Sequence, residues 1–90
     1  MTEKKRMVEL SSQQLMYLRN TNFLPALLVQ LVATAQTSEG KYHVPVSRDT
    51  AEQFRDAFTN RLAKVGFDAN YEPTSEGKVL EELIDRFYFR

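Results

Sequence analysis

The chain has 90 residues, and its 12 basic and 12 acidic side chains give a formal net charge of zero. This length allows one domain, and 42% hydrophobic residues are typical of a globular protein. The absence of cysteine excludes disulfides, thiol nucleophiles and cysteine-ligated metals, and it favours the cytoplasm. A net charge of zero gives no overall field to attract nucleic acid or an anionic membrane. We therefore expect a soluble cytoplasmic protein without a metal or other cofactor.

The N-terminal part of the sequence predicts a short tail followed by a helix. Residues 1–6 are mostly charged and predict a flexible tail, so that residues 7–90 form the single globular domain. Residues 7–10 predict either a short strand or an extended lead into a helix. Ser11 precedes Gln14 by three residues, which is the spacing of a capping box, and a helix over 12–20 should follow.

A second helix is predicted over residues 24–35, and its composition is apolar nearly all round. Pro25 suits its first turn, where a missing N–H does no harm. A helix without a polar face is normally surrounded by protein, so we expect this helix at the centre of the core. Gln30 interrupts the apolar run, which is also shorter than the roughly 20 residues that cross a bilayer, so no membrane contact is expected.

The middle of the chain predicts a loop and then a strand. Residues 36–41 are rich in turn-forming residues and predict the loop. Residues 41–47 alternate Tyr42, Val44 and Val46 with His43 and Pro45, the period of a strand. Since proline cannot donate a ladder hydrogen bond, such a strand should lie at the edge of a sheet.

The second half of the chain predicts two further helices. The third follows a cap at Ser47 or Asp49, continues to Val65 and stops at Gly66; its inward residues are Ala51, Phe54, Phe58, Leu62 and Val65. Residues 67–73 predict an extended segment or a turn. The last helix follows a cap at Thr74 or Ser75, with Val79, Leu80, Leu83, Ile84 and Phe87 inward. The expected fold is therefore mainly α, a compact four-helix domain with one or two short β segments.

The stretch before and within the last helix resembles the end of winged-helix transcription regulators. There a wing strand enters the final helix through a Tyr-x-Leu-Thr-x-x-Gly-x-x-Leu pattern, and the matching residues are Tyr71, Pro73, Thr74, Gly77 and Leu80. Pro73 replaces the leucine of that pattern, and the charged side chains within residues 68–86 are mainly acidic. The resemblance implies an alternative, winged-helix-like α+β fold, in which Val44 or Val46 would pair with residues near Tyr71.

The same resemblance implies an alternative function, the binding of nucleic acid by a regulator. Its candidate contacts lie on the third helix: Arg48, Arg55, Arg61 and Lys64. Asp49, Glu52 and Asp56 lie among these cations, so ion pairs within the helix are the simpler expectation.

The sequence offers little that is typical of an enzyme. His43 is the only histidine, and the sequence around it contains no nucleophile elbow, glycine-rich phosphate loop or paired-carboxylate pattern. We therefore expect no catalytic residues.

The C-terminus places three aromatic residues, Phe87, Tyr88 and Phe89, side by side. One helix face cannot direct all three rings into a core, so at least one should meet another surface. Tyr17 and Phe23, near the break between the first two helices, are candidates to receive them. We therefore expect a small non-catalytic protein–protein interaction or regulatory module that forms a homodimer or binds a protein partner through Phe87, Tyr88, Phe89, Tyr17 and Phe23.

Overall fold

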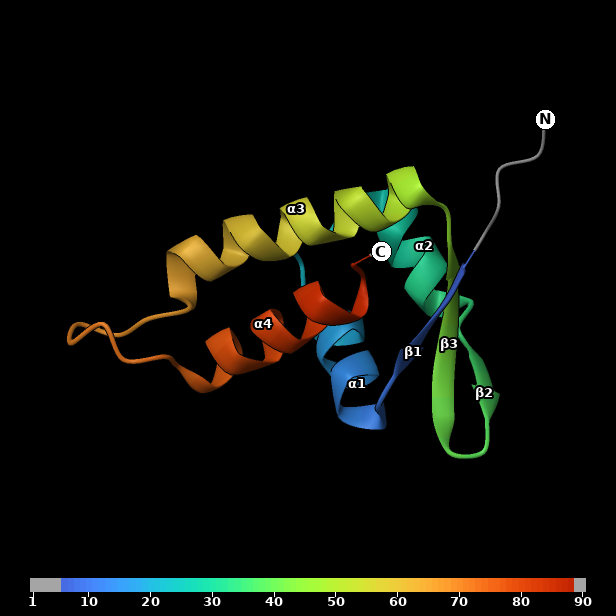
Figure 1. Cartoon of the computed structure of the whole chain (residues 1–90), viewed down its shortest axis with the longest axis horizontal. Coiled ribbons are helices and arrows are strands. Elements are labelled where there is room, and N and C mark those ends of the chain that lie inside the picture. The colour runs from blue at the N-terminus through green and yellow to red at the C-terminus, as the bar shows by residue number, and fades with distance from the viewer. Residues whose placement is uncertain (1–5, 89–90) are drawn as a thin grey trace.

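The computed structural model describes residues 6–88 and contains four helices and a small antiparallel sheet (Figure 1). The strands are β1 (Arg6–Leu10), β2 (Gln36–Ser38) and β3 (Lys41–Val46). The helices are α1 (Ser12–Asn20), α2 (Ala26–Ala33), α3 (Arg48–Val65) and α4 (Ser75–Arg86). The four predicted helices are confirmed. The predicted tail lies outside the described residues except for Arg6, which belongs to β1.

The strand order β1-β3-β2 places β3 in the middle of the sheet, so the expectation of an edge strand at residues 41–47 is wrong. Pro45 lies opposite Met7 of β1, and β2 pairs only with the first three residues of β3, from Lys41 to His43. At Pro45 the strand therefore has a neighbour on one side only. The proline is accommodated because β2 is short.

Residues 36–41, predicted as a loop, form β2 and a tight turn into β3. Ser38 pairs with Lys41, so Glu39 and Gly40 are the two turn residues. Their φ angles of 53° and 78° are both positive, as type I′ hairpin turns require. The sequence Glu-Gly lacks the Asn or Asp that usually marks such a turn, which is why the pattern did not indicate a hairpin.

The pairing of β3 also contradicts the alternative winged-helix-like fold. Val44 lies opposite Val8, and Val46 lies opposite Arg6, whereas residues 67–73 close on themselves through a single bridge between Phe67 and Pro73. The φ angle of Tyr71 is 60°, which is not a strand conformation. The winged-helix-like arrangement, in which residues 41–47 and 67–73 pair, is therefore not the one that this chain adopts.

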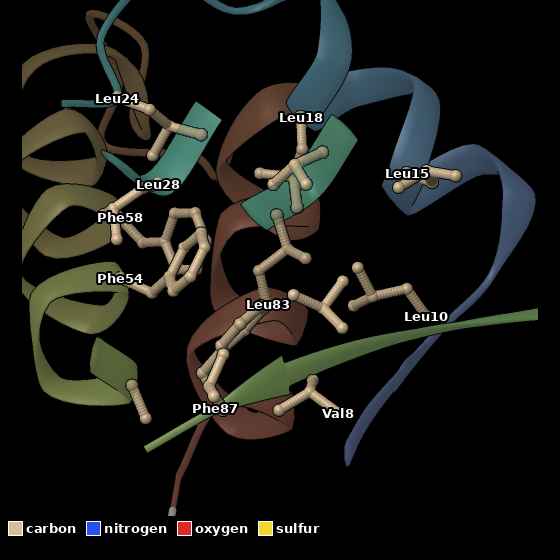
Figure 2. Close-up of a cluster of buried hydrophobic side chains, with 14 of the residues drawn as sticks. Val8, Leu10, Leu15, Leu18, Leu24, Leu28, Phe54, Phe58, Leu83 and Phe87 are labelled. Atoms are coloured by element: carbon tan, nitrogen blue, oxygen red, sulfur yellow. The ribbon is translucent and has the colours of Figure 1, made fainter. Parts of the chain in front are cut away.

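The core lies between the α3–α4 pair, the inner face of the sheet, and α1 and α2 (Figure 2). α3 and α4 run side by side in opposite directions and make the most extensive helix contact (Figure 1). Alternation along β3 turns Val44 and Val46 inward, as predicted, and Val8 of β1 is buried beside them. The fully buried aromatic rings come from α3 and from the end of α4: Phe54, Phe58 and Phe87.

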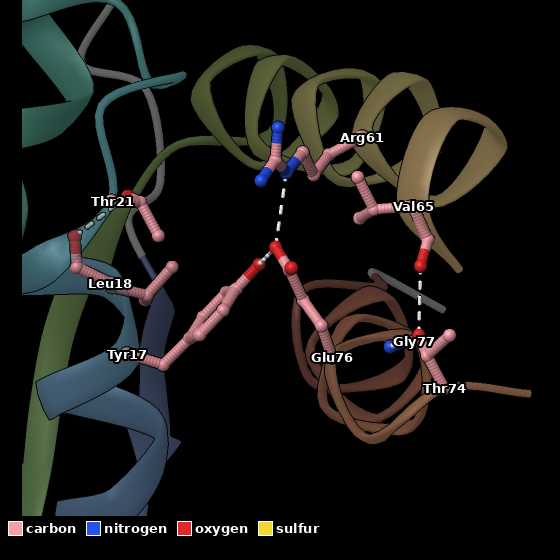
Figure 3. Close-up of polar contacts among 8 residues, drawn as sticks. All are labelled: Tyr17, Leu18, Thr21, Arg61, Val65, Thr74, Glu76 and Gly77. Carbon is pink, nitrogen blue, oxygen red and sulfur yellow. Dashed lines mark hydrogen bonds and ion pairs between the residues drawn. The ribbon is translucent and has the colours of Figure 1, made fainter. Parts of the chain in front are cut away.

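The Thr-x-x-Gly segment has a structural explanation in the way α4 begins against the end of α3. The Thr74 hydroxyl donates to the Val65 carbonyl at 2.8 Å and accepts from the Gly77 N–H at 2.9 Å (Figure 3). A Cβ on Gly77 would overlap the backbone of Gly66, 2.9 Å from its Cα. Gly66 itself has a right-handed φ of −72°, so glycine is used here for close approach and not for a left-handed cap.

α2 is not the centre of the core, contrary to the prediction. Its inner residues Leu28 and Val32 are buried, but the side chains of Leu27 and Val29 are 54% and 46% exposed. The helix lies beside β3 and contacts α1 (Figure 1), and its opposite side is exposed within the described residues. Pro25 is its N-cap and not a residue of its first turn.

Candidate functional site

The C-terminal aromatics do not form one exposed cluster. The ring of Phe87 is fully buried, stacked on Phe54 with 4.5 Å between ring centroids and 5.4 Å from the ring of Phe58. A fully buried side chain cannot form a surface contact in the folded chain, so Phe87 is removed from the candidate interface. Tyr88 is 56% exposed, and Phe89 lies outside the described residues.

Tyr17 and Phe23 do not receive the ring of Phe87 as expected. Their rings lie 6.3 Å apart, and Phe23 meets the edge of Phe58 at 6.5 Å. The rings that receive Phe87 are Phe54 and Phe58, since the last turn of α4 faces α3 and not the junction between α1 and α2. The sequence could not show this because the distance along the chain does not fix which helix α4 packs against.

Tyr17 belongs instead to a polar cluster that joins three helices (Figure 3). Its hydroxyl donates to Glu76 Oε2 at 2.6 Å, and Arg61 Nε donates to the same oxygen at 3.0 Å. These bonds connect α1, α3 and α4. Grooves of about 500 and 410 Å³ lie beside the cluster, and both are lined by Phe23 and Arg61.

The cluster shifts the ionisation of its members. Burial, followed by the hydrogen bond to Glu76, raises the pKa of Tyr17 above its ordinary value of 10.0. The hydrogen bond from Tyr17 is the main cause of the lowered pKa of Glu76, with further contributions from Arg61. The carboxylate is therefore ionised and occupied by two donors, an arrangement that holds the helices together.

Glu76→Gln tests this role. The pKa of Glu76 is lower in the folded chain than its ordinary value of 4.5, so its stabilising contribution is complete above pH 4.5 and is lost as the pH falls through the lowered pKa. We expect the variant to lose about 1 kcal/mol of unfolding free energy at pH 7. This is less than the roughly 1.5–3 kcal/mol of a hydrogen bond to a charged group, because the Arg61 and Glu76 side chains are about one-third exposed to water. Urea unfolding at a series of pH values should then show that the unfolding free energy of Glu76→Gln falls less between neutral and acid pH than that of the wild type.

Glu81→Gln is the matched control, because Glu81 lies exposed on the same helix. If Glu76→Gln and Glu81→Gln give the same stability and the same acid dependence, the cluster does not stabilise the fold.

Two of the candidate nucleic-acid contacts are bound within the protein. Arg55 Nη1 donates to the Phe87 carbonyl at 2.8 Å, and its guanidinium lies 5.2 Å from the centroid of the Tyr88 ring. Arg61 pairs with Glu76, as described, and lies over the ring of Phe23. Both arginines therefore bind partners outside α3, and the prediction that they form ion pairs within the helix is wrong for these two residues. Arg48 and Lys64 are exposed near opposite ends of α3. The four cations do not form one surface that is free for phosphate.

Two of the large apolar side chains that are exposed within residues 6–88, Leu27 and Val29, lie on α2, a helix that the sequence predicted to be surrounded by protein. We define the outer face of α2 as its exposed residues Ala26, Leu27, Val29, Gln30 and Ala33. All eight residues of the helix are uncharged, and Gln30 is the only polar one. The signal was present in the sequence as an apolar helix without a polar side, but it was interpreted as evidence of burial by this chain alone.

Within residues 6–88, each helix is too short or too polar to cross a membrane. The same part of the chain places no three His, Asp or Glu side chains close enough to hold a metal ion.

Comparison with protein-family models, with curated protein sequences and with solved structures gave no match to this chain. Its function must therefore be inferred from its own residues.

Proposed function

We propose that this chain is a small non-catalytic interaction module that self-associates, and that the outer face of α2 is its contact surface. The observation that carries the proposal is the exposure of Leu27 and Val29 on a helix with no charged residue. Helices that are apolar on all sides are normally covered on all sides, and residues 6–88 leave one side of α2 exposed. A second protein surface would remove the rest from water.

A second copy of the chain is the partner that the charges favour. The outer face of α2 offers no cation for a phosphate or an anionic lipid and no anion for a basic partner. The chain itself has a formal net charge of zero, so two copies do not repel each other over long range. A 90-residue chain also buries a smaller fraction of its surface than larger domains do, so it gains from additional burial.

A non-catalytic role is supported by the polar cluster. Tyr17 and Arg61 both donate to Glu76, and the pKa of Tyr17 is raised, so its phenol is a weaker acid than usual. These groups therefore serve the packing of α1, α3 and α4, and they are not presented for acid–base chemistry.

The expected association is weak. An eight-residue helix is about 12 Å long, so a contact made through it falls among the small interfaces, below about 1,200 Å², that dissociate readily. Sedimentation should therefore show an average mass that rises from monomer towards dimer between about 10 µM and about 1 mM protein.

Leu27→Lys combined with Val29→Lys tests the contact surface. Both side chains are about half exposed, so the monomer should keep its fold, while four charges would meet in the dimer. We expect the double variant to stay monomeric over the whole concentration range, with a circular dichroism spectrum like that of the wild type.

Met16→Lys is the control, because Met16 is 62% exposed on α1 and not on α2. It should associate as the wild type does. A wild-type chain that remains monomeric at about 1 mM, or a double variant that still dimerises, would contradict the proposal.

A further inference from the structure

We infer that the two copies pack α2 against α2 in antiparallel directions, about a twofold axis beside Gln30. This inference rests on the proposed self-association and adds the orientation and register of the contact.

The ends of α2 favour an antiparallel neighbour. Its first turn has no acidic residue, its last turn has no basic residue, and its N-cap Pro25 makes no side-chain cap hydrogen bond. The other three helices are capped by the side chains of Ser11, Ser47 and Thr74. An antiparallel α2 brings the partly negative C-terminal end of one helix beside the partly positive N-terminal end of the other. A parallel pair would place like ends together.

Gln30 lies near the middle of the outer face and suits a twofold axis. Its amide contains both a donor and an acceptor, so two Gln30 side chains related by the axis can hydrogen-bond to each other. The only polar group of the helix would then be satisfied inside the contact. A lysine or glutamate at this position would face its own charge in the second copy.

The residues on either side of Gln30 complete the register. Ala26 lies about one turn before Gln30, and Ala33 lies about one turn after it, on the same side of the helix. An antiparallel pair centred on Gln30 therefore places Ala26 of one copy against Ala33 of the other. Small side chains at these positions allow the two helix axes to approach to about 8 Å, the short end of helix packing distances. Leu27 and Val29 then cover the two flanks of the contact.

Single cysteines test this geometry directly, because the chain has none of its own. A disulfide forms only when the two Cα atoms lie about 4.4–6.8 Å apart. We expect Gln30→Cys to form a covalent dimer at least about tenfold faster than Met16→Cys, because the dimer raises the local concentration of its thiols. Met16→Cys lies outside the contact and measures the rate of cross-linking by random collision. Both variants are oxidised in the intact folded chain at a concentration where sedimentation detects dimer.

Ala26→Cys and Ala33→Cys separate the two orientations. Each alone should cross-link no faster than Met16→Cys, whereas an equimolar mixture, with one chain carrying a tag, should give mostly the mixed dimer. Rapid cross-linking of Ala26→Cys with itself would show a parallel pair and overturn the inference.

The remaining outcomes separate this inference from the proposed function. If the chain dimerises but Gln30→Cys cross-links only at the rate of Met16→Cys, the register is wrong while self-association stands. If the chain is monomeric, both fail.

Discussion

Phe87→Ala is expected to lower the free energy of unfolding by about 3–5 kcal/mol, the usual range for a buried phenylalanine. The ring is fully buried and stacks on Phe54 at 4.5 Å, so alanine would leave a cavity between α3 and α4 that the aromatic cluster cannot readily fill. For a domain of 90 residues this is a large part of a total stability of about 5–13 kcal/mol. Urea unfolding followed by circular dichroism measures the change.

Tyr88→Ala is the matched control, since Tyr88 is the next residue and is 56% exposed. It loses the contact with Arg55 but leaves the core intact, so we expect a loss below about 1 kcal/mol. This pair of variants also separates a core role from an interface role at the C-terminus. If Phe87→Ala leaves stability unchanged but alters the mass of the protein in solution, our correction of the predicted interface is wrong.

Gly77→Ala is expected to destabilise the protein by about 2 kcal/mol or more, as overpacked sites do. Glycine within a helix normally costs about 0.5–1 kcal/mol relative to alanine, so propensity alone predicts a change of the opposite sign. The added Cβ would overlap the backbone of Gly66, and no side-chain rotation can relieve that contact. The first turn of α4 would have to move away from the end of α3, which weakens the hydrogen bonds that Thr74 makes there.

Thermal unfolding compares Gly77→Ala with Ser75→Ala, a change in the same turn at an exposed position. Ser75→Ala should alter the melting temperature little. A higher melting temperature for Gly77→Ala than for the wild type would show that α4 does not approach Gly66 as closely as described.

Local patterns predicted the helices because their signals lie within a few residues. The capping box at Ser11 and Gln14 is present, with Gln14 N–H donating to Ser11 Oγ at 3.1 Å and Ser11 N–H donating to Gln14 Oε1 at 3.0 Å. The inward stripe of α3 was right for Ala51, Phe54 and Phe58, while Leu62 and Val65 are only partly buried. They lie at the end of α3 that extends past the sheet, where less of the chain packs against it (Figure 1).

Pairings between distant segments were harder to predict. β1 and β3 are separated by about 30 residues, and nothing in either segment states that Val8 lies opposite Val44. The proposed contact surface was missed for a related reason. The apolar composition of α2 was visible in the sequence. How many other elements pack against α2 depends on the tertiary arrangement, and the sequence did not predict it.

By itself, the sequence determined that four helices form and, except for α2, close to where they begin and end, and that the chain has neither cysteine nor excess charge. These properties depend on nearby residues or on composition, so they do not need the three-dimensional arrangement. Only the tertiary structure decided that Phe87 belongs to the core, that Arg61 and Tyr17 share Glu76, and that one side of α2 stays exposed. These three features depend on which helices and strands pack against one another in a small core. That packing involves segments that are far apart in the chain, so no single segment of the sequence predicts it.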